Sequence, residues 1–126
     1  MLSMTIKTFE DIIAWQKSRE LFLIINKSLV NCKNYSYKDQ LLRATLSISN
    51  NIAEGFDRGS NKELRQFLVI SRGSAAEVRS MLLIAEDLKL ISPENLQNSM
   101  ILVKDISRLL TGFIKSINGQ QKTDNG

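Results

Sequence analysis

The 126-residue sequence has no histidine, one cysteine, one proline and six glycines. The lack of histidine excludes imidazole as a general base, as the partner of a serine or cysteine nucleophile, and as a ligand of zinc, iron or haem. A single cysteine, Cys32, forms no disulfide within the chain, which fits a reducing compartment. The scarcity of proline and glycine favours long helices over an all-β fold with many turns. We therefore expect a helical binding protein that is not an enzyme and holds no cofactor or metal.

Long apolar runs are missing as well. The longest, residues 21–25 and 81–85, are much shorter than the roughly 20 residues that a membrane span needs. Residues 1–7 show no charged leader followed by an apolar stretch, so no signal peptide is expected. Met4 is an alternative translation start. These features predict a cytoplasmic protein without a membrane partner.

Helical periodicity is present in four segments, where apolar residues recur at spacings of three and four. They predict helices over residues 10–32, 37–54, 61–90 and 93–118. Because the connections are short, neighbouring helices should be antiparallel. The expected fold is all-α, an antiparallel up-down-up-down four-helix bundle in one domain over residues 1–118. Residues 119–126 are polar and are predicted to form a disordered tail. A long helical hairpin that completes its core only in an oligomer would show the same periodicity.

Apolar seams identify the residues expected in the core. The first helix has Trp15, Ser18, Phe22, Ile25, Leu29 and Cys32, with Leu21 and Ile24 beside them. The second has Leu41, Ala44 or Thr45, Ile48 and Ile52. The third has Leu64, Leu68, Ser71, Ala75, Val78, Leu82 and Ala85. The fourth has Leu96, Met100, Val103, Ile106, Leu110, Phe113 and Ile117.

Several residues mark expected helix ends. Asp11 suits the first turn of the first helix, where a negative charge interacts favourably with the helix dipole. Gly55 is predicted to follow the end of the second helix, because glycine accepts positive φ at little cost. Residues 60–63 match a capping box, and Ser92 with Pro93 is typical of a helix start.

Reactive groups have no suitable partners in the sequence. Glu54 and Asp57 form a Glu-x-x-Asp pair, but they straddle a helix end, where capping and solubility explain them better than a metal does. Ser71, Ser74 and Ser80 have no histidine base and no nucleophile elbow. Cys32 lies on an apolar seam and is interpreted as a buried structural thiol.

One face of the second predicted helix is polar without being highly charged. Its residues are Gln40, Arg43, Ser47, Asn50 or Asn51, and Glu54. A plain solvated face would carry more lysine and glutamate, whereas amides, a hydroxyl and one Arg–Glu pair suit hydrogen bonding to another protein surface.

Basic residues form a second polar pattern. Arg65, Arg72 and Arg79 are spaced by seven on the third predicted helix, with Lys62 near the same end and Arg58 in the preceding turn. Arginine forks bind phosphates, but they also pair with carboxylates such as those of Glu54, Glu77 or Glu86. The net charge is +4, and the basic excess falls in residues 1–79, whereas residues 80–126 are balanced. A symmetric assembly would concentrate this charge.

Three motifs resemble the 23S rRNA intervening-sequence protein family of four-helix bundles. They are Trp15-Gln16, Ser47-Ile-x-x-Asn51-Ile-Ala-Glu54-Gly55 and Gly73-Ser74-x-x-Glu77, and the resemblance extends over residues 9–117. It implies a left-handed antiparallel bundle and a ring-like homopentamer. Related bundles are accessory proteins of diversity-generating retroelements, in which a basic pentamer binds RNA and the reverse transcriptase.

The resemblance also implies which positions are characteristic of the family. Those expected at a subunit interface or in a polar network are Trp15, Gln16, Gln40, Arg43, Ser47, Asn51, Glu54, Gly73, Ser74 and Glu77. Where the family usually has alanine before Gly-Ser, this chain has Ser71-Arg72, which makes the region more basic.

Two functions are consistent with these observations. The first is an oligomeric accessory protein that binds RNA or DNA through Arg58, Lys62, Arg65, Arg72 and Arg79. The second is a structural scaffold that binds a protein partner, such as a reverse transcriptase, through the polar face of the second helix and does not bind nucleic acid.

Overall fold

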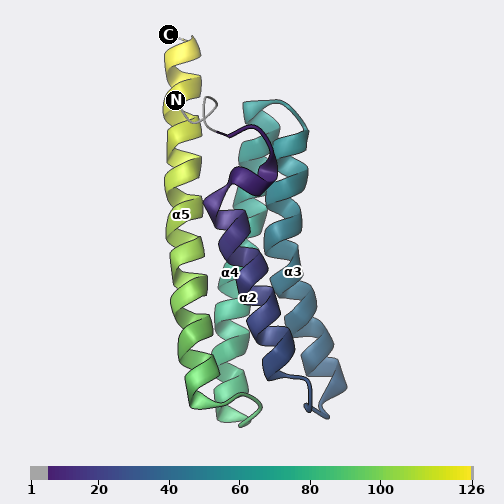
Figure 1. The fold of residues 1–126 in the computed structure, drawn as a ribbon. Coiled ribbons are helices and arrows are strands. Elements are labelled where there is room, and N and C mark those ends of the chain that lie inside the picture. Colours follow the sequence, from purple (N-terminus) through teal and green to yellow (C-terminus); the bar gives the residue numbers. More distant parts are fainter. Residues whose placement is uncertain (1–5, 126) are drawn as a thin grey trace.

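Four long helices lie side by side in the computed structural model of the protein (Figure 1), which describes the backbone of residues 6–125 and the side chains of residues 6–119. A short 3₁₀ helix, η1 (Phe9–Asp11), precedes them. The four are α2 (Ile13–Ser28), α3 (Tyr35–Asp57), α4 (Asn61–Asp87) and α5 (Pro93–Asn125).

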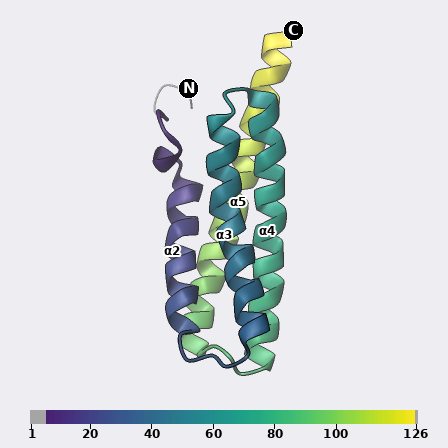
Figure 2. The ribbon, with the colours of Figure 1, turned by 90° about the vertical axis from the view of Figure 1, so that its right-hand side faces the viewer.

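Each long helix packs against two others, so that α2, α3, α4 and α5 close into a ring around one core. The α2–α3 and α4–α5 connections lie at one end of the bundle and the α3–α4 connection at the other (Figure 2). This arrangement confirms the antiparallel up-down-up-down four-helix bundle. The core closes within a single chain, so the helical hairpin that needs an oligomer is not the fold observed.

The predicted core seams are largely confirmed. All the seam residues of α3 and α4 are buried, including the polar Thr45 and Ser71. In α5, Met100 and Phe113 are half-buried while Ile114 is buried. The buried face of α2 is rotated from the predicted one: Trp15, Phe22 and Cys32 are half-buried, and their places are taken by the residues Ala14 and Leu21.

Gly55 does not end its helix, contrary to the prediction. The α3 helix continues to Asp57, and the positive φ of 85° is found at Gly59 in the α3–α4 turn. A Cβ added to Gly55 would lie 2.5 Å from the Cβ of Phe67 on α4. Gly55 therefore allows α3 and α4 to approach closely, which is a packing requirement rather than a turn requirement.

At the other helix ends, the two predicted N-terminal caps are confirmed, whereas the predicted end of the third helix is not. The capping box is confirmed, since Ser60 Oγ accepts from the backbone N–H of Glu63 at 3.2 Å. Ser92 caps α5 in the same way, with Pro93 in the first helical position. The α4 helix ends at Asp87, before the predicted 90, because the chain turns at Lys89 with a left-handed φ of 57°.

Asp11 lies before α2 rather than within its first turn. Its Oδ2 accepts from the backbone N–H of Lys7 at 2.9 Å and of Thr8 at 3.1 Å. These two backbone hydrogen bonds lower the pKa of the Asp11 carboxyl below its ordinary value. The first long helix begins at Ile13, three residues after the predicted start.

The last helix is longer than predicted. It continues through Gly119 to Asn125, across most of the segment 119–126 that was expected to be a disordered tail, and residue 126 lies outside the described residues. A single glycine within a helix costs about 1 kcal/mol relative to alanine and does not by itself end the helix.

Candidate nucleic-acid interface

The edge between α4 and α5 carries the arginines that are spaced by seven residues. Nε of Arg65 donates to Oδ1 of Asn118 at 2.7 Å, and Nη1 of Arg72 donates to Oγ1 of Thr111 at 3.3 Å. Both arginines are half-buried. Because their acceptors are neutral, the hydrogen bonds hold the guanidinium groups in place without neutralising their charge.

These two contacts define the register of the antiparallel pair. Thr111 and Asn118 are also seven residues apart, so a further step of seven in each helix brings Arg79 level with Lys104. Lys115 lies between Thr111 and Asn118 on the same face of α5, four residues from the first and three from the second. The group is called the basic face and consists of Arg65, Arg72, Arg79, Lys104 and Lys115.

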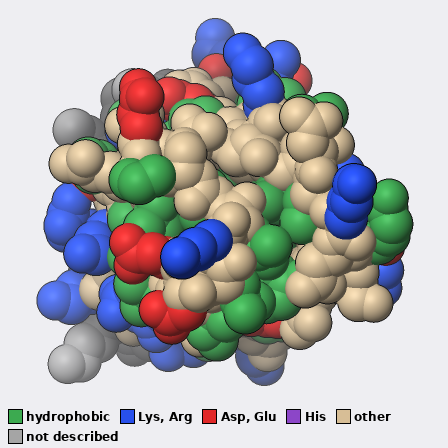
Figure 3. Space-filling model, turned by 90° about the horizontal axis from the view of Figure 1, so that it is seen from below, with side chains coloured by type: hydrophobic (Ala, Val, Ile, Leu, Met, Phe, Trp, Pro, Cys, Tyr) green, Lys and Arg blue, Asp and Glu red, His purple; other side chains and the backbone are tan. Residues whose placement is uncertain are grey.

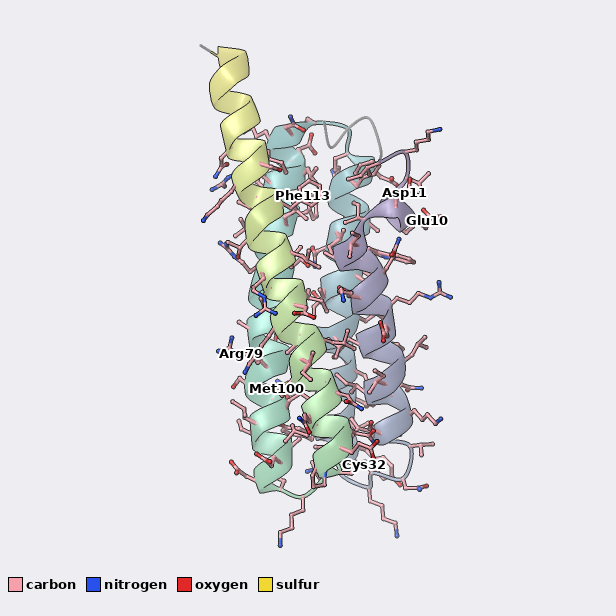
Figure 4. The ribbon with its side chains drawn as sticks, turned by 60° about the vertical axis from the view of Figure 1, so that its left-hand side comes forward. Glu10, Asp11, Cys32, Arg79, Met100 and Phe113 are labelled. Carbon is pink, nitrogen blue, oxygen red and sulfur yellow. The ribbon has the colours of Figure 1, made fainter. Side chains whose placement is uncertain are left out.

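The charge of the basic face is not compensated locally. Within residues 6–119, no carboxylate forms an ion pair with any of these side chains. Asp105 of α5 is directed toward α2, with Oδ2 3.9 Å from Nζ of Lys17, and it also pairs with Arg108. Figure 3 shows Lys and Arg side chains gathered along the margin on which α5 lies, and Figure 4 shows Arg79 on the side of α4 and α5 that faces away from α2.

Arg58 is in a different environment from the other predicted phosphate ligands. Its guanidinium lies 2.9 Å from Glu54 and 3.7 Å from Glu63, and its Cζ lies 5.1 Å from the centroid of the Phe67 ring. Two carboxylates thus balance its charge. Lys62 is exposed at the start of α4, one turn before Arg65, and extends the basic face toward that end of the bundle.

Three residues of the predicted interface set form an internal polar network between α3 and α4. The hydroxyls of Ser47 and Ser74 are hydrogen-bonded at 2.9 Å. Nδ2 of Asn51 donates to the backbone oxygen of Ser47 at 2.8 Å and to its Oγ at 3.0 Å. The buried Ser71 adds a hydrogen bond of 2.8 Å to the backbone oxygen of Ile48. These short polar side chains join two helices of the same chain.

Three other predicted interface residues lie with Ser47 in one surface hollow. It has a volume of about 550 Å³ and is lined by Gln40, Arg43, Ser47 and Glu77, together with Ser36, Asp39 and Ala44. We call it the α3–α4 hollow. Glu54, from the same polar face of the second predicted helix, lies outside the hollow and pairs with Arg58.

Trp15 and Gln16 hold the start of the chain against α2. The Trp15 ring packs edge-on against Phe9 with the centroids 5.2 Å apart, and Cζ of Arg19 lies 5.9 Å from the Trp15 centroid. Nε2 of Gln16 donates to the backbone oxygen of Glu10 at 2.8 Å. Both residues therefore stabilise the η1 turn within this chain.

Gly73 is exposed, and a Cβ added there would meet nothing within 4 Å. Its neighbours on the same outer face of α4, at spacings of three and four, are also small or apolar and exposed. They are Val69, Ala76, Ser80 and Leu83. Within the chain, α3 and α4 approach closely at Gly55, whereas Gly73 faces open space.

Reactive groups show no assembled centre in the part of the chain that the structure describes. No three His, Cys, Asp or Glu side chains there lie close enough together to hold a metal ion. The Cys32 thiol is half-buried rather than buried, and its Sγ lies 3.8 Å from the backbone oxygen of Asn34. No described helix combines the length and hydrophobicity needed to cross a membrane.

Lys104 and Lys115 are the residues that sequence reasoning missed. The charges of residues 80–126 balance in total, and this balance concealed their arrangement in space. Glu86, Asp87 and Glu94 lie near the α4–α5 connection, while the two lysines lie farther along α5. Positions 104, 111 and 118 are spaced by seven, and Lys115 lies three residues before 118, so this spacing is the signal that would have placed both lysines on one face of α5.

The fold and its surface define a small all-α protein, a four-helix bundle with a basic face along the edge between α4 and α5. The chain belongs to the 23S rRNA-intervening sequence protein family, whose model matches residues 10–112. A crystal structure of a protein of unknown function from the S23 ribosomal protein family of Bacteroides thetaiotaomicron VPI-5482 is similar, with 29% identity and a TM-score of 0.75. That match covers 82% of this chain and 99% of the other. No match was found among curated proteins.

Proposed function

We propose that this protein binds nucleic-acid phosphates on its basic face and acts, without catalysing a reaction, as a cytoplasmic accessory factor. The observation that carries the proposal is the set of cations without carboxylate partners, two of them held in place by Asn118 and Thr111. Arginine forks match phosphate geometry, and clustered cations release counterions when they bind a nucleic acid. The family name refers to 23S rRNA, which is consistent with such a ligand.

Charge reversal tests this proposal. In gel shifts at low salt with structured RNA and duplex DNA, the wild-type chain is expected to bind. A variant with Arg65→Glu, Arg72→Glu and Arg79→Glu is expected to lose binding while its far-UV circular dichroism stays that of the wild type. Failure of the wild type to bind either probe would contradict the proposal.

We further propose a homo-oligomer, a pentamer in line with the family resemblance, that joins copies through the outer face of α4. That face exposes Val69 and Leu83 beside Gly73, where a neighbouring helix would meet no side chain. Light scattering should give a mass several times 14.3 kDa for the wild type and a lower mass for Leu83→Glu. A wild-type mass near that of one chain would contradict an oligomer.

A protein scaffold is the alternative function, and the α3–α4 hollow is the observation that favours it. Arg43, Asp39 and Glu77 give the hollow both signs of charge, and Gln40 and Ser47 add hydrogen-bonding groups. Such a surface suits a polar protein interface. Capture of one defined protein from the native host, lost with Arg43→Ala and Glu77→Ala, would support the alternative; recovery of RNA alone would count against it.

A further inference from the structure

The basic face has a fixed and regular geometry. Seven residues of α-helix rise about 10.5 Å, so the Cα atoms of Arg65 and Arg79 are about 21 Å apart, with Arg72 midway. The lysines of α5 form a second row, about 8–10 Å away if the helix axes have the usual spacing. The cations therefore form two parallel rows along the side of a rigid bundle.

Two of the arginine heads are hydrogen-bonded within the chain in the absence of a ligand. Arg65 and Arg72 are held by Asn118 and Thr111 on the neighbouring helix. Fixed cations fit best to a ligand whose phosphates are also fixed, because neither partner then loses much conformational entropy. A flexible single strand would have to be ordered along both rows, which weakens its binding.

Stacking groups are absent from the basic face in the described part of the chain. Single-stranded nucleic acids are usually held by aromatic side chains on which bases stack. The nearest candidates on these helices point elsewhere: Phe67 packs against Gly55 beneath Arg58, and Phe113 lines a groove between α2 and α5 with Ala14. The face thus offers contacts to phosphates and none to unstacked bases.

We infer that the ligand of the basic face is a double-stranded nucleic acid, bound through its phosphate backbones and independently of base sequence. The inference rests on the proposed function and narrows it to one class of ligand. The arginines lie along the side of the bundle rather than on a protruding loop or helix end, so they meet a duplex from outside its grooves. Phosphate contacts of this kind position a protein but carry no sequence information.

Fluorescence anisotropy on the full chain tests the inference. The probes are an RNA duplex and a DNA duplex of about 20 base pairs, roughly two helical turns, together with the isolated strands in unstructured sequences. Both duplexes are expected to bind with a Kd about tenfold lower than their strands, because the strands lose more entropy. Tighter binding of one duplex would show whether the ligand is double-stranded RNA or double-stranded DNA, and it would still support the inference.

Single strands that bind as tightly as the duplexes would overturn the inference and leave nucleic-acid binding intact. No binding of any probe would instead overturn the proposed function. The variant with Arg65→Gln, Arg72→Gln and Arg79→Gln should lose duplex binding. Its control, with Arg19→Gln, Lys27→Gln and Lys33→Gln, removes the same charge from exposed positions on α2 and the α2–α3 connection and should retain it. Equal losses in both variants would show attraction to net charge only and would contradict a defined face.

Discussion

The two sides of α4 are built from different chemistry. Toward α3, the contact consists of neutral hydroxyls at Ser71 and Ser74 and a glycine, Gly55, against an aromatic ring. Toward α5, arginines reach neutral acceptors at Asn118 and Thr111. The α3 side satisfies its polar groups within the chain, whereas the α5 side satisfies hydrogen bonds but retains charge. Hydrogen bonding and charge compensation are thus separate properties. The α5 side carries cations alone, whereas the charged residues that line the hollow on the α3 side, Asp39, Arg43 and Glu77, are of both signs.

The largest expected effect on the α3 side follows from Gly55→Ala. The new methyl group would lie 2.5 Å from the Cβ of Phe67, so α3 and α4 must separate. Overpacking of this kind costs about 1–3 kcal/mol in the free energy of unfolding, measured by denaturant titration. Gly112→Ala on α5 is the matched control, since its methyl group meets open space and alanine is the better helix former. If Gly55→Ala were no less stable than Gly112→Ala, the tight α3–α4 contact would be wrong.

Substituting Arg72 and Arg58 in turn tests whether an arginine without a carboxylate partner contributes more to duplex binding than an arginine in an ion pair. Arg72→Gln removes a cation of the basic face and is expected to weaken duplex binding about five- to tenfold at low salt, a cost of about 1–1.4 kcal/mol. Arg58→Gln removes a cation balanced by Glu54 and Glu63 and should change the Kd less than about twofold. Anisotropy titrations of both variants measure this difference. Equal losses would mean that local carboxylates do not decide which arginines bind.

Ser74→Ala tests the neutral side of α4. It removes the hydrogen bond to Ser47 and should lower the free energy of unfolding by about 1 kcal/mol. The loss should be no larger, because the Ser47 hydroxyl keeps its hydrogen bond to Asn51. Nucleic-acid affinity should stay that of the wild type. A loss of affinity without a loss of stability would place Ser74 in the ligand site and contradict this division of α4.

The smallest expected effect is at the start of the chain, far from both sides of α4. Backbone hydrogen bonds lower the pKa of Asp11 in the folded state below its ordinary, unfolded-state value. The carboxylate therefore stabilises the η1 turn at a pH above that value, and the contribution is lost as the pH falls through the folded pKa. The Thr8 amide resonance should titrate with a pKa below that of an unperturbed aspartate, and this step should vanish in Asp11→Asn. A titration at or above the unfolded value would contradict the two hydrogen bonds.

The sequence predicted the core well because helical periodicity is a property of the chain itself. Every seam residue expected on α3 and α4 is buried, and the caps at Ser60 and Ser92 are local signals within four residues. The positions that failed depend on neighbours in space. The prediction that Gly55 follows a helix end failed because this glycine is needed for contact with Phe67, which lies on another helix. The turn at Lys89 was missed because this left-handed position lacks the glycine that usually marks one.

The candidate site was predictable only in part. The seven-residue spacing of Arg65, Arg72 and Arg79 was visible in the sequence and places them on one edge. Their acceptors on α5 were not visible, because pairing between helices depends on register. Arg58 shows both cases: Glu54 lies four residues before it and was visible in the sequence, whereas Glu63 comes close only through the turn at Gly59.

Salt dependence of duplex binding tests the central claim most directly. With five phosphate contacts, the slope of log K against log salt concentration should be about −4.5, since each contact contributes about −0.9. Neutralising Arg65, Arg72 and Arg79 to glutamine together should make the slope less steep by about 2.7, if any binding remains measurable. A duplex affinity that does not change with salt, or a slope that the three substitutions leave unchanged, would show that the basic face does not bind phosphates.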